Sequence, residues 1–196
     1  MILVTGATGL VGSRVVARLT ARGTGVRCLV RDPRRLGAQR VRVQITLGDL
    51  ADPAWLRQGL RGVRTVVHLG ATRRDQPHAT IEEIDALATW RLMRGAEAAG
   101  VEHVVYLTPL GATPWHRARV QRAKALAEQA VAEAALRTTT LRSSLVYAPG
   151  ADPLTRLARL PAVPLAGLGR GTVRPIHADD VAQAILAVVD RPAAGA

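Results

Sequence analysis

The sequence has very little cysteine, lysine or aromatic residue. Its 196 residues include one cysteine, no phenylalanine and an aromatic fraction of 3%. The single Cys28 excludes an internal disulfide framework and a metal site made of several cysteines. No apolar run reaches the roughly 18 residues that a membrane helix needs, and the start lacks the pattern of a secretory signal. These absences favour a cytoplasmic protein without a membrane span.

The charge of the chain is strongly one-sided. There are 27 basic and 15 acidic residues, which gives a formal net charge of +12. Such a balance raises the question of a nucleic-acid partner. However, Lys124 is the only lysine, and the arginines are spread along the chain instead of gathering in one segment. We therefore expect a small anionic ligand rather than nucleic acid.

Short apolar runs alternate with helical patterns along most of the chain. This alternation indicates βαβ units, and hence a doubly wound, mainly parallel sheet of the Rossmann type with helices on both faces. Strands are expected at about residues 2–4, 26–30, 41–45, 65–69, 104–107 and 138–141. Helices are expected at about residues 12–22, 80–99 and 116–136, from Asp52-Pro53, and from Asp179 or Asp180 to about residue 190.

We expect residues 1–196 to form a single domain. The composition changes only after about residue 148, where prolines and glycines interrupt the alternation. Such residues end helices and strands. Residues 148–178 are therefore expected to form a short irregular C-terminal lobe, a partial substrate lobe laid over the sheet edge.

The strongest local signal is the segment 5–12, Thr-Gly-Ala-Thr-Gly-Leu-Val-Gly, between a predicted strand and a predicted helix. A dinucleotide-binding loop requires this context. One glycine permits the tight turn, the second lets the backbone approach a pyrophosphate, and the third lets the helix pack on the strand. Amides at the helix start would face the phosphates. The expected contacts are Gly6, Thr8, Gly9, Leu10, Val11 and Gly12. The alternative is a glycine-rich turn without a ligand.

The end of the second strand bears on the choice of cofactor. Arg31, Arg34 and Arg35 could bind the 2′-phosphate of NADP, whereas Asp32 could bind the ribose hydroxyls of NAD. We favour NADP(H) over NAD(H). The alternative is that Asp32-Pro33 only begins a helix and that the arginines are solvated.

Taken together, these segments resemble the short-chain dehydrogenase/reductase superfamily, in its atypical or extended branch, which includes NmrA-like and epimerase-like proteins. The resemblance rests on the glycine spacing, on Val30-Arg31-Asp32-Pro33 and on segments 48–50, 69–71, 84–89, 141–147 and 175–182. Within segment 84–89, Asp85 and Thr89 match the Asn or Asp and the Thr of the family's central helix. It implies cofactor contacts from Asp49 and Leu50 at the adenine, Gly70 and Ala71 beside the riboses, Lys124 at the nicotinamide ribose, and Leu145 and Val146 along the nicotinamide.

The catalytic motif of that superfamily is incomplete. Lys124 matches the lysine of its Tyr-x-x-x-Lys motif, but Val120 stands where the tyrosine is expected. Thr108 lies near the position of the family's catalytic hydroxyl, although Pro109 could equally occupy that position. Losing a positioned acid typically costs about 10²–10⁴-fold in rate. Two substitute acids are Tyr147, which could instead simply pack, and His116, which could instead be a solvent-exposed residue at a helix start.

These features lead to three functional hypotheses. The first is an NAD(P)H-dependent oxidoreductase whose small-molecule acceptor, such as a flavin or quinone, needs no protein acid. The second is an NAD(P)-binding redox sensor or structural subunit without catalysis. The third and weakest is a nucleotide-sugar epimerase or dehydratase, because those enzymes generally need the tyrosine and a large substrate lobe. No metal is expected, and a homo-oligomer that completes the site is left open.

Overall fold

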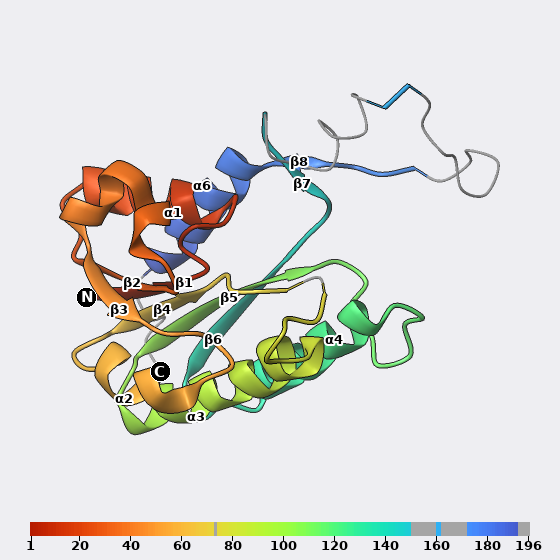
Figure 1. Ribbon diagram of the computed structural model, residues 1–196, viewed down its shortest axis with the longest axis horizontal. Helices are drawn as coiled ribbons and strands as arrows, with labels where there is room; N and C mark the ends of the chain where they lie inside the picture. Colours follow the sequence, from red (N-terminus) through yellow and green to blue (C-terminus); the bar gives the residue numbers. More distant parts are fainter. Residues whose placement is uncertain (73, 150–159, 162–171, 192–196) are drawn as a thin grey trace.

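The computed structural model describes residues 1–72, 74–149, 160–161 and 172–191 (Figure 1). Six strands form one sheet in the order β3-β2-β1-β4-β5-β6, and every neighbouring pair is parallel. The strands are β1 (Ile2–Thr5), β2 (Val26–Val30), β3 (Gln44–Leu47), β4 (Thr65–His68), β5 (His103–Pro109) and β6 (Arg137–Ser143). The predicted Rossmann-type α/β fold is thereby confirmed.

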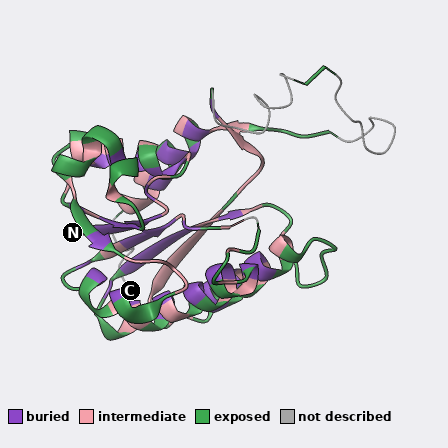
Figure 2. Ribbon diagram, in the orientation of Figure 1, coloured by how far each residue is buried: buried purple, intermediate pink, exposed green. Residues whose placement is uncertain are grey.

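Helices cover both faces of this sheet. In Figure 1, α1 (Gly12–Ala21) and α6 (Ala178–Val189) lie on one side, and α2 (Leu56–Gly59), α3 (Ala88–Ala98) and α4 (Arg119–Ala132) lie on the other. Each layer has its own apolar core against the sheet. The central strands are therefore buried on both sides (Figure 2), which explains why they read as continuous apolar runs instead of alternating ones.

The order of the strands decides where a ligand can bind. The chain runs outward from β1 to β2 and β3, and then returns to place β4 on the opposite side of β1. The connections after β1 and β4 consequently diverge to opposite faces of the sheet. In an open α/β sheet this reversal leaves a crevice at the carboxyl ends of the strands, where ligands bind.

The predicted third strand begins too early in the sequence. Residues 33–42 instead form a 3₁₀ segment, η1 (Pro33–Arg42), whose first turn is capped by Asp32, which accepts the N–H of Arg34 at 2.9 Å. Val41 is 83% exposed and has no core to pack against. The helix-start signal of Asp32-Pro33 therefore outweighs the apolar alternation at this position, and the strand starts only at Gln44.

Several predicted helix limits also shift. The predicted helix 80–99 contains a π-helical turn, η3 (Glu83–Leu87), before α3, and α4 begins at Arg119 rather than at residue 116. The last helix is capped by His177, whose Nδ1 accepts the N–H of Asp179, and not by either aspartate. The predicted short helix after Asp52 is confirmed as η2 (Pro53–Trp55) and α2.

The predicted C-terminal lobe falls mostly outside the described residues. Within the described part, β7 (Val146–Tyr147) pairs in parallel with β8 (Ile176–His177), apart from the main sheet. No helix among the described residues is long and apolar enough to cross a membrane.

Candidate dinucleotide-binding site

A cavity of about 580 Å³ lies at the carboxyl ends of β1 to β4. This volume is within the usual range for a small-molecule site. Its lining includes Gly6, Thr8 and Gly9 after β1; Arg31, Asp32 and Arg35 after β2; Asp49 and Leu50 after β3; and Gly70, Ala71, Thr72, Arg74 and Gln76 after β4. Four strand ends thus contribute to one cavity.

The three glycines of the turn after β1 meet different surroundings. At Gly6, with φ of 67°, an added Cβ would lie 2.6 Å from the carbonyl carbon of Leu69, and at Gly12 it would lie 2.1 Å from the carbonyl oxygen of Gly6. Those two positions need glycine for close packing. At Gly9 a Cβ would meet only the carbonyl oxygen of Gly6, at 3.1 Å. The remaining space at Gly9 suits a phosphate group, which needs close approach to the backbone.

The side of the cavity formed by β2 and β3 carries mixed charge. Arg31 Nη1 lies 3.4 Å from Asp49 Oδ2, so these two side chains partly neutralise each other. The carboxylate of Asp32 is engaged at the start of η1. Arg35 also lines the cavity, whereas Arg34 is not among its lining residues.

A buried chain of hydrogen bonds ties β1 to β4 beneath the cavity. The Gly70 N–H donates to Thr5 Oγ1 at 3.2 Å, and Thr5 Oγ1 lies 2.6 Å from His68 Nδ1. On the other side, the hydroxyl of Thr89 donates to the carbonyl of Asp85 and therefore accepts from His68 Nε2 at 2.9 Å. Nε2 therefore carries a proton, and in the neutral imidazole Nδ1 accepts the proton of the Thr5 hydroxyl.

The protonation of His68 follows from the same burial. Desolvation, aided by the charge of Lys124, lowers the pKa of His68 to about 3. With both ring nitrogens partnered, His68 is the buried and satisfied histidine that its place on a strand suggests.

A buried ion pair lies next to this chain. Lys124 Nζ is 3.0 Å from Asp85 Oδ1, with side-chain exposures of 5% and 0%. Desolvation acts to lower the pKa of Lys124, but its partners outweigh this and raise the pKa, whereas burial of Asp85 raises its pKa despite Lys124. Asp85 Oδ1 also accepts the Thr72 N–H at 3.3 Å. The ion pair therefore anchors the backbone that enters the cavity wall.

Comparison with known proteins agrees with this geometry. A profile of a family described as NAD(P)H-binding matches residues 6–192. The chain belongs to this NAD(P)H-binding family.

The individual proteins that this chain resembles in sequence or structure have different names and functions. The chain is 40% identical over 108 residues to the (4-alkanoyl-5-oxo-2,5-dihydrofuran-3-yl)methyl phosphate reductase of Streptomyces griseus, over 55% of this chain and 34% of the relative. It is 29% identical over 126 residues to the photosystem II assembly factor Ycf39 of Cyanophora paradoxa, over 64% of this chain and 39% of that protein. The chain thus spans only 34% to 39% of the length of these curated relatives.

Among solved structures, MoeE5 in complex with UDP-glucuronic acid and NAD superposes with a TM-score of 0.80 and 28% identity, over 99% of this chain and 73% of that one. Together with the family match, these relatives confirm the resemblance to the atypical or extended short-chain dehydrogenase/reductase branch. The protein is an NAD(P)H-binding protein with a Rossmann-type fold.

The predicted cofactor contacts divide into two groups in this NAD(P)H-binding chain. The residues that line the cavity are Gly6, Thr8, Gly9, Arg31, Asp49, Leu50, Gly70 and Ala71. The residues outside its lining are Leu10, Val11, Gly12, Arg34, Lys124, Leu145 and Val146. Of the latter, Leu145 and Val146 lie at β7, where the carbonyl of Leu145 accepts the N–H of Ile176.

The predicted catalytic residues are not gathered around that cavity. Thr108 is buried on β5, and its hydroxyl has no hydrogen-bond partner within the described part of the chain. Tyr147 packs edge-on against His177, with ring centroids 5.2 Å apart. His116 is exposed ahead of α4, where its Nδ1 accepts the N–H of Ala118. It therefore lies before α4, although the expected helix began at residue 116.

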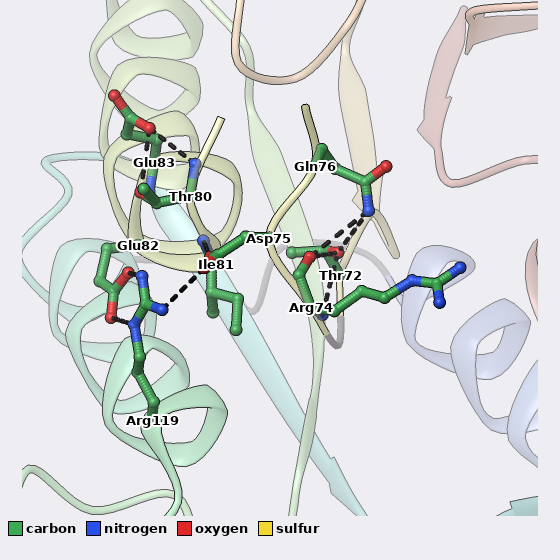
Figure 3. Close-up of polar contacts among 9 residues, drawn as sticks. All are labelled: Thr72, Arg74, Asp75, Gln76, Thr80, Ile81, Glu82, Glu83 and Arg119. Carbon is green, nitrogen blue, oxygen red and sulfur yellow. Dashed lines mark hydrogen bonds and ion pairs between the residues drawn. The ribbon is translucent and has the colours of Figure 1, made fainter. Parts of the chain in front are cut away.

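The loop after β4 supplies cavity residues that the sequence analysis did not identify. Thr72, Arg74 and Gln76 lie in a polar segment without periodicity, so no pattern marked them. Figure 3 shows this loop together with Arg119, whose guanidinium lies 2.6 Å from Glu82 and 2.9 Å from Asp75. The only sequence feature related to this loop was Asp85, which matches the central helix of the resembling family. Asp85 accepts the N–H of Thr72 at the start of the loop.

Proposed function

We propose that this protein is an NAD(P)H-dependent oxidoreductase that prefers NADP(H) and reduces a flavin- or quinone-type acceptor. The observation that carries the proposal is a cavity lined by Gly9, where an added Cβ would meet only one backbone oxygen, and by Arg31 and Arg35 after β2. In such a cavity the pyrophosphate would lie against Gly6, Thr8 and Gly9, close to the start of α1, where backbone amides and the helix dipole favour anions.

The proposed orientation places the adenosine half at β2 and β3. Arg31 and Arg35 would bind the 2′-phosphate, because a guanidinium makes strong charge-assisted bonds to phosphate. Asp49 and Leu50 would lie at the adenine, and Gly70 and Ala71 beside the riboses. The Arg31–Asp49 pair is compatible with this assignment, because a separation of 3.4 Å between exposed groups leaves the guanidinium free to turn toward a stronger anion.

The nature of the acceptor follows from Val120, which leaves no phenol one helical turn before Lys124. A bound NAD(P)H supplies a hydride, and a flavin or quinone can take its balancing proton from water. The Lys124 ammonium retains two N–H groups beyond its bond to Asp85, so we assign it to a ribose hydroxyl. Thr108, Tyr147 and His116 remain lesser candidates for contact with the acceptor.

A second candidate function is NAD(P) binding without turnover. It is favoured by the burial of Lys124 against Asp85, since this leaves the cavity wall without an accessible catalytic group of the usual kind. The similarity to a protein named as a photosystem II assembly factor points in the same direction. Sustained oxidation of NADPH with flavins or quinones would support the enzyme, whereas tight binding without oxidation would support the second candidate.

The decisive experiment is a titration with NADPH and NADH, followed by tryptophan fluorescence and calorimetry. Trp55 is a suitable probe because it packs on Gly48, which lines the cavity. Gly9→Val should abolish binding, because its side chain would fill the space proposed for the pyrophosphate. Gly25→Val is the matched control, since a Cβ at Gly25 meets only Met1, at 3.8 Å. Normal binding by Gly9→Val would contradict the proposed phosphate site.

The preference for NADPH is tested separately. Arg31→Ala should weaken NADPH about tenfold and leave NADH almost unchanged, because only NADPH carries the 2′-phosphate. The exposed Arg57, outside the cavity, gives the control Arg57→Ala. Equal weakening of both nucleotides would remove Arg31 from the 2′-phosphate.

A further inference from the structure

The cavity has a second cationic end that the dinucleotide assignment leaves unused. Arg74 lines it from the loop after β4, whereas Arg31 and Arg35 line it from beyond β2. β1 lies between β2 and β4 in the sheet. With about 4.8 Å between neighbouring strands, the two ends are separated by roughly 10 Å at the level of the sheet.

The charge of Arg74 is not compensated within the described part of the chain. All of its polar contacts there are made by its backbone: its carbonyl accepts from Thr72 Oγ1 at 2.7 Å and from Gln76 Nε2 at 3.4 Å, and its N–H donates to Thr72 Oγ1. Figure 3 shows its side chain extending away from this turn, on the side opposite Arg119. At the other end of the cavity, Arg31 has Asp49.

The loop that carries Arg74 is held on both sides. Before it, the N–H of Thr72 is fixed by the buried Asp85. After it, Asp75 accepts from the N–H of Ile81 at 2.8 Å and from Arg119 at 2.9 Å. An arginine on a braced loop loses less conformational entropy when it binds than one on a loose loop. The bracing therefore favours a recognition role for Arg74.

We propose that Arg74 recognises an anionic group, a phosphate or sulfonate, on the acceptor. This inference rests on the proposed reductase function and adds the substrate class: acceptors that carry an acidic tail. The pyrophosphate of the dinucleotide is the alternative anionic group for Arg74 to bind. We favour the acceptor because the glycine turn after β1 already offers the pyrophosphate a place, and Arg74 lies beyond it on the β4 side.

Pairs of acceptors that differ in one anionic group test whether Arg74 binds the acceptor or the pyrophosphate of the dinucleotide. FMN and riboflavin differ only in the phosphate, and 1,4-naphthoquinone and 1,4-naphthoquinone-2-sulfonate differ only in the sulfonate. Binding of each to the NADP⁺-loaded protein is followed by flavin fluorescence or calorimetry, in addition to NADPH oxidation. The wild type should bind the anionic member of a pair about tenfold more tightly. Arg74→Gln should bring this ratio below about two, with the affinities for riboflavin and NADPH unchanged. Arg57→Gln should leave all values as they are.

Each contrary outcome has its own meaning. If Arg74→Gln weakens NADPH and leaves the acceptor ratio unchanged, Arg74 contacts the dinucleotide and the proposal is wrong. If the wild type binds NADPH but binds the two members of each acceptor pair equally well, or binds none of the acceptors, the proposal is also wrong. The proposed dinucleotide site would then be retained. If the wild type binds neither NADPH nor NADH, the proposed function itself fails, and this inference fails with it.

Arg119 is the corresponding positioning residue, since it holds Asp75 and Glu82 without lining the cavity. Arg119→Gln should lower the FMN-to-riboflavin ratio by a smaller factor than Arg74→Gln and leave riboflavin binding unchanged. A purely structural role would weaken both flavins equally, and that result would remove Arg119 from the proposal.

Discussion

Two polar networks hold the loop after β4, and they differ in their exposure to solvent. The buried network joins Thr5, His68, Thr89, Asp85 and Lys124 beneath the cavity. The exposed latch joins Asp75, Glu82 and Arg119 at the surface. Buried groups pay a large desolvation cost when a partner is lost, whereas exposed pairs contribute little to stability. The buried network should therefore determine whether the fold survives, and the latch should determine only where the loop lies.

The largest effect should follow from removal of Lys124. Lys124→Met leaves the carboxylate of Asp85 buried without a cation, and such a loss typically costs about 3–5 kcal/mol. Urea denaturation at pH 7 measures this cost. The double variant Lys124→Met with Asp85→Asn should regain most of the stability, because the amide keeps an acceptor for Thr72 and carries no charge. Arg57→Met is the exposed control. A loss below about 1 kcal/mol in Lys124→Met would contradict the contrast between the two networks.

The next effect should appear in the pH dependence of stability. His68 has a folded-state pKa of about 3, below its ordinary value of 6.5, so the unfolded chain takes up a proton first as the pH falls. The contribution of the neutral imidazole is therefore complete above about pH 6.5 and is lost between that value and pH 3. Between pH 6.5 and pH 4.5 the wild type should lose about 2–3 kcal/mol through this group.

The variant His68→Asn removes that titration and should flatten the stability profile over this range. His116→Asn, at an exposed histidine, should leave the profile of the wild type intact. Denaturant unfolding at several pH values provides the comparison. Parallel profiles for the wild type and His68→Asn would indicate that the imidazole is not buried in its neutral form.

The two networks also differ in how much of them the sequence could predict. The strand that carries His68 and the helix that carries Lys124 follow from apolar runs and helical spacing, and both were expected within a few residues. The resemblance to a known family placed Asp85 and Thr89 on the same central helix. What no pattern indicated was that Lys124 would bond to Asp85, because this contact joins residues 39 positions apart.

The latch was less predictable for a physical reason. Residues 72–79 have no apolar periodicity, and the capping box of Thr80 and Glu83 fixes only the start of the helical segment that follows. The contact of Arg119 with Asp75 spans 44 positions. One of many arginines in a chain of net charge +12 gives no sign of which carboxylate it will bind. Arg74 was missed for the same reason. In contrast, the glycine spacing predicted the turn that borders the cavity, because the positive φ of Gly6 and the close approach of Gly12 to the Gly6 carbonyl are local features.

The smallest effect on stability should come from the latch. Arg119 lowers the pKa of Asp75 and of Glu82 through direct hydrogen bonds. The stabilisation from these ion pairs is therefore fully present above the ordinary pKa of a carboxyl group. It is lost only as the pH falls through the lowered pKa values of Asp75 and Glu82. In Arg119→Gln both pKa values should rise toward their ordinary range, so the loop should loosen at a higher pH, while the urea midpoint at pH 7 stays unchanged.

Carbon-detected NMR titration of the carboxyl groups and hydrogen exchange of the Ile81 amide measure these two consequences. The amide of Ile81 should exchange faster in Arg119→Gln because its acceptor, Asp75, is no longer held. Arg64→Gln is the matched control, since Arg64 forms a similar exposed pair with Glu102 and should shift only that carboxyl. If Arg119→Gln lowered global stability as Lys124→Met does, exposure would not separate the two networks, and the latch would be part of the folded core.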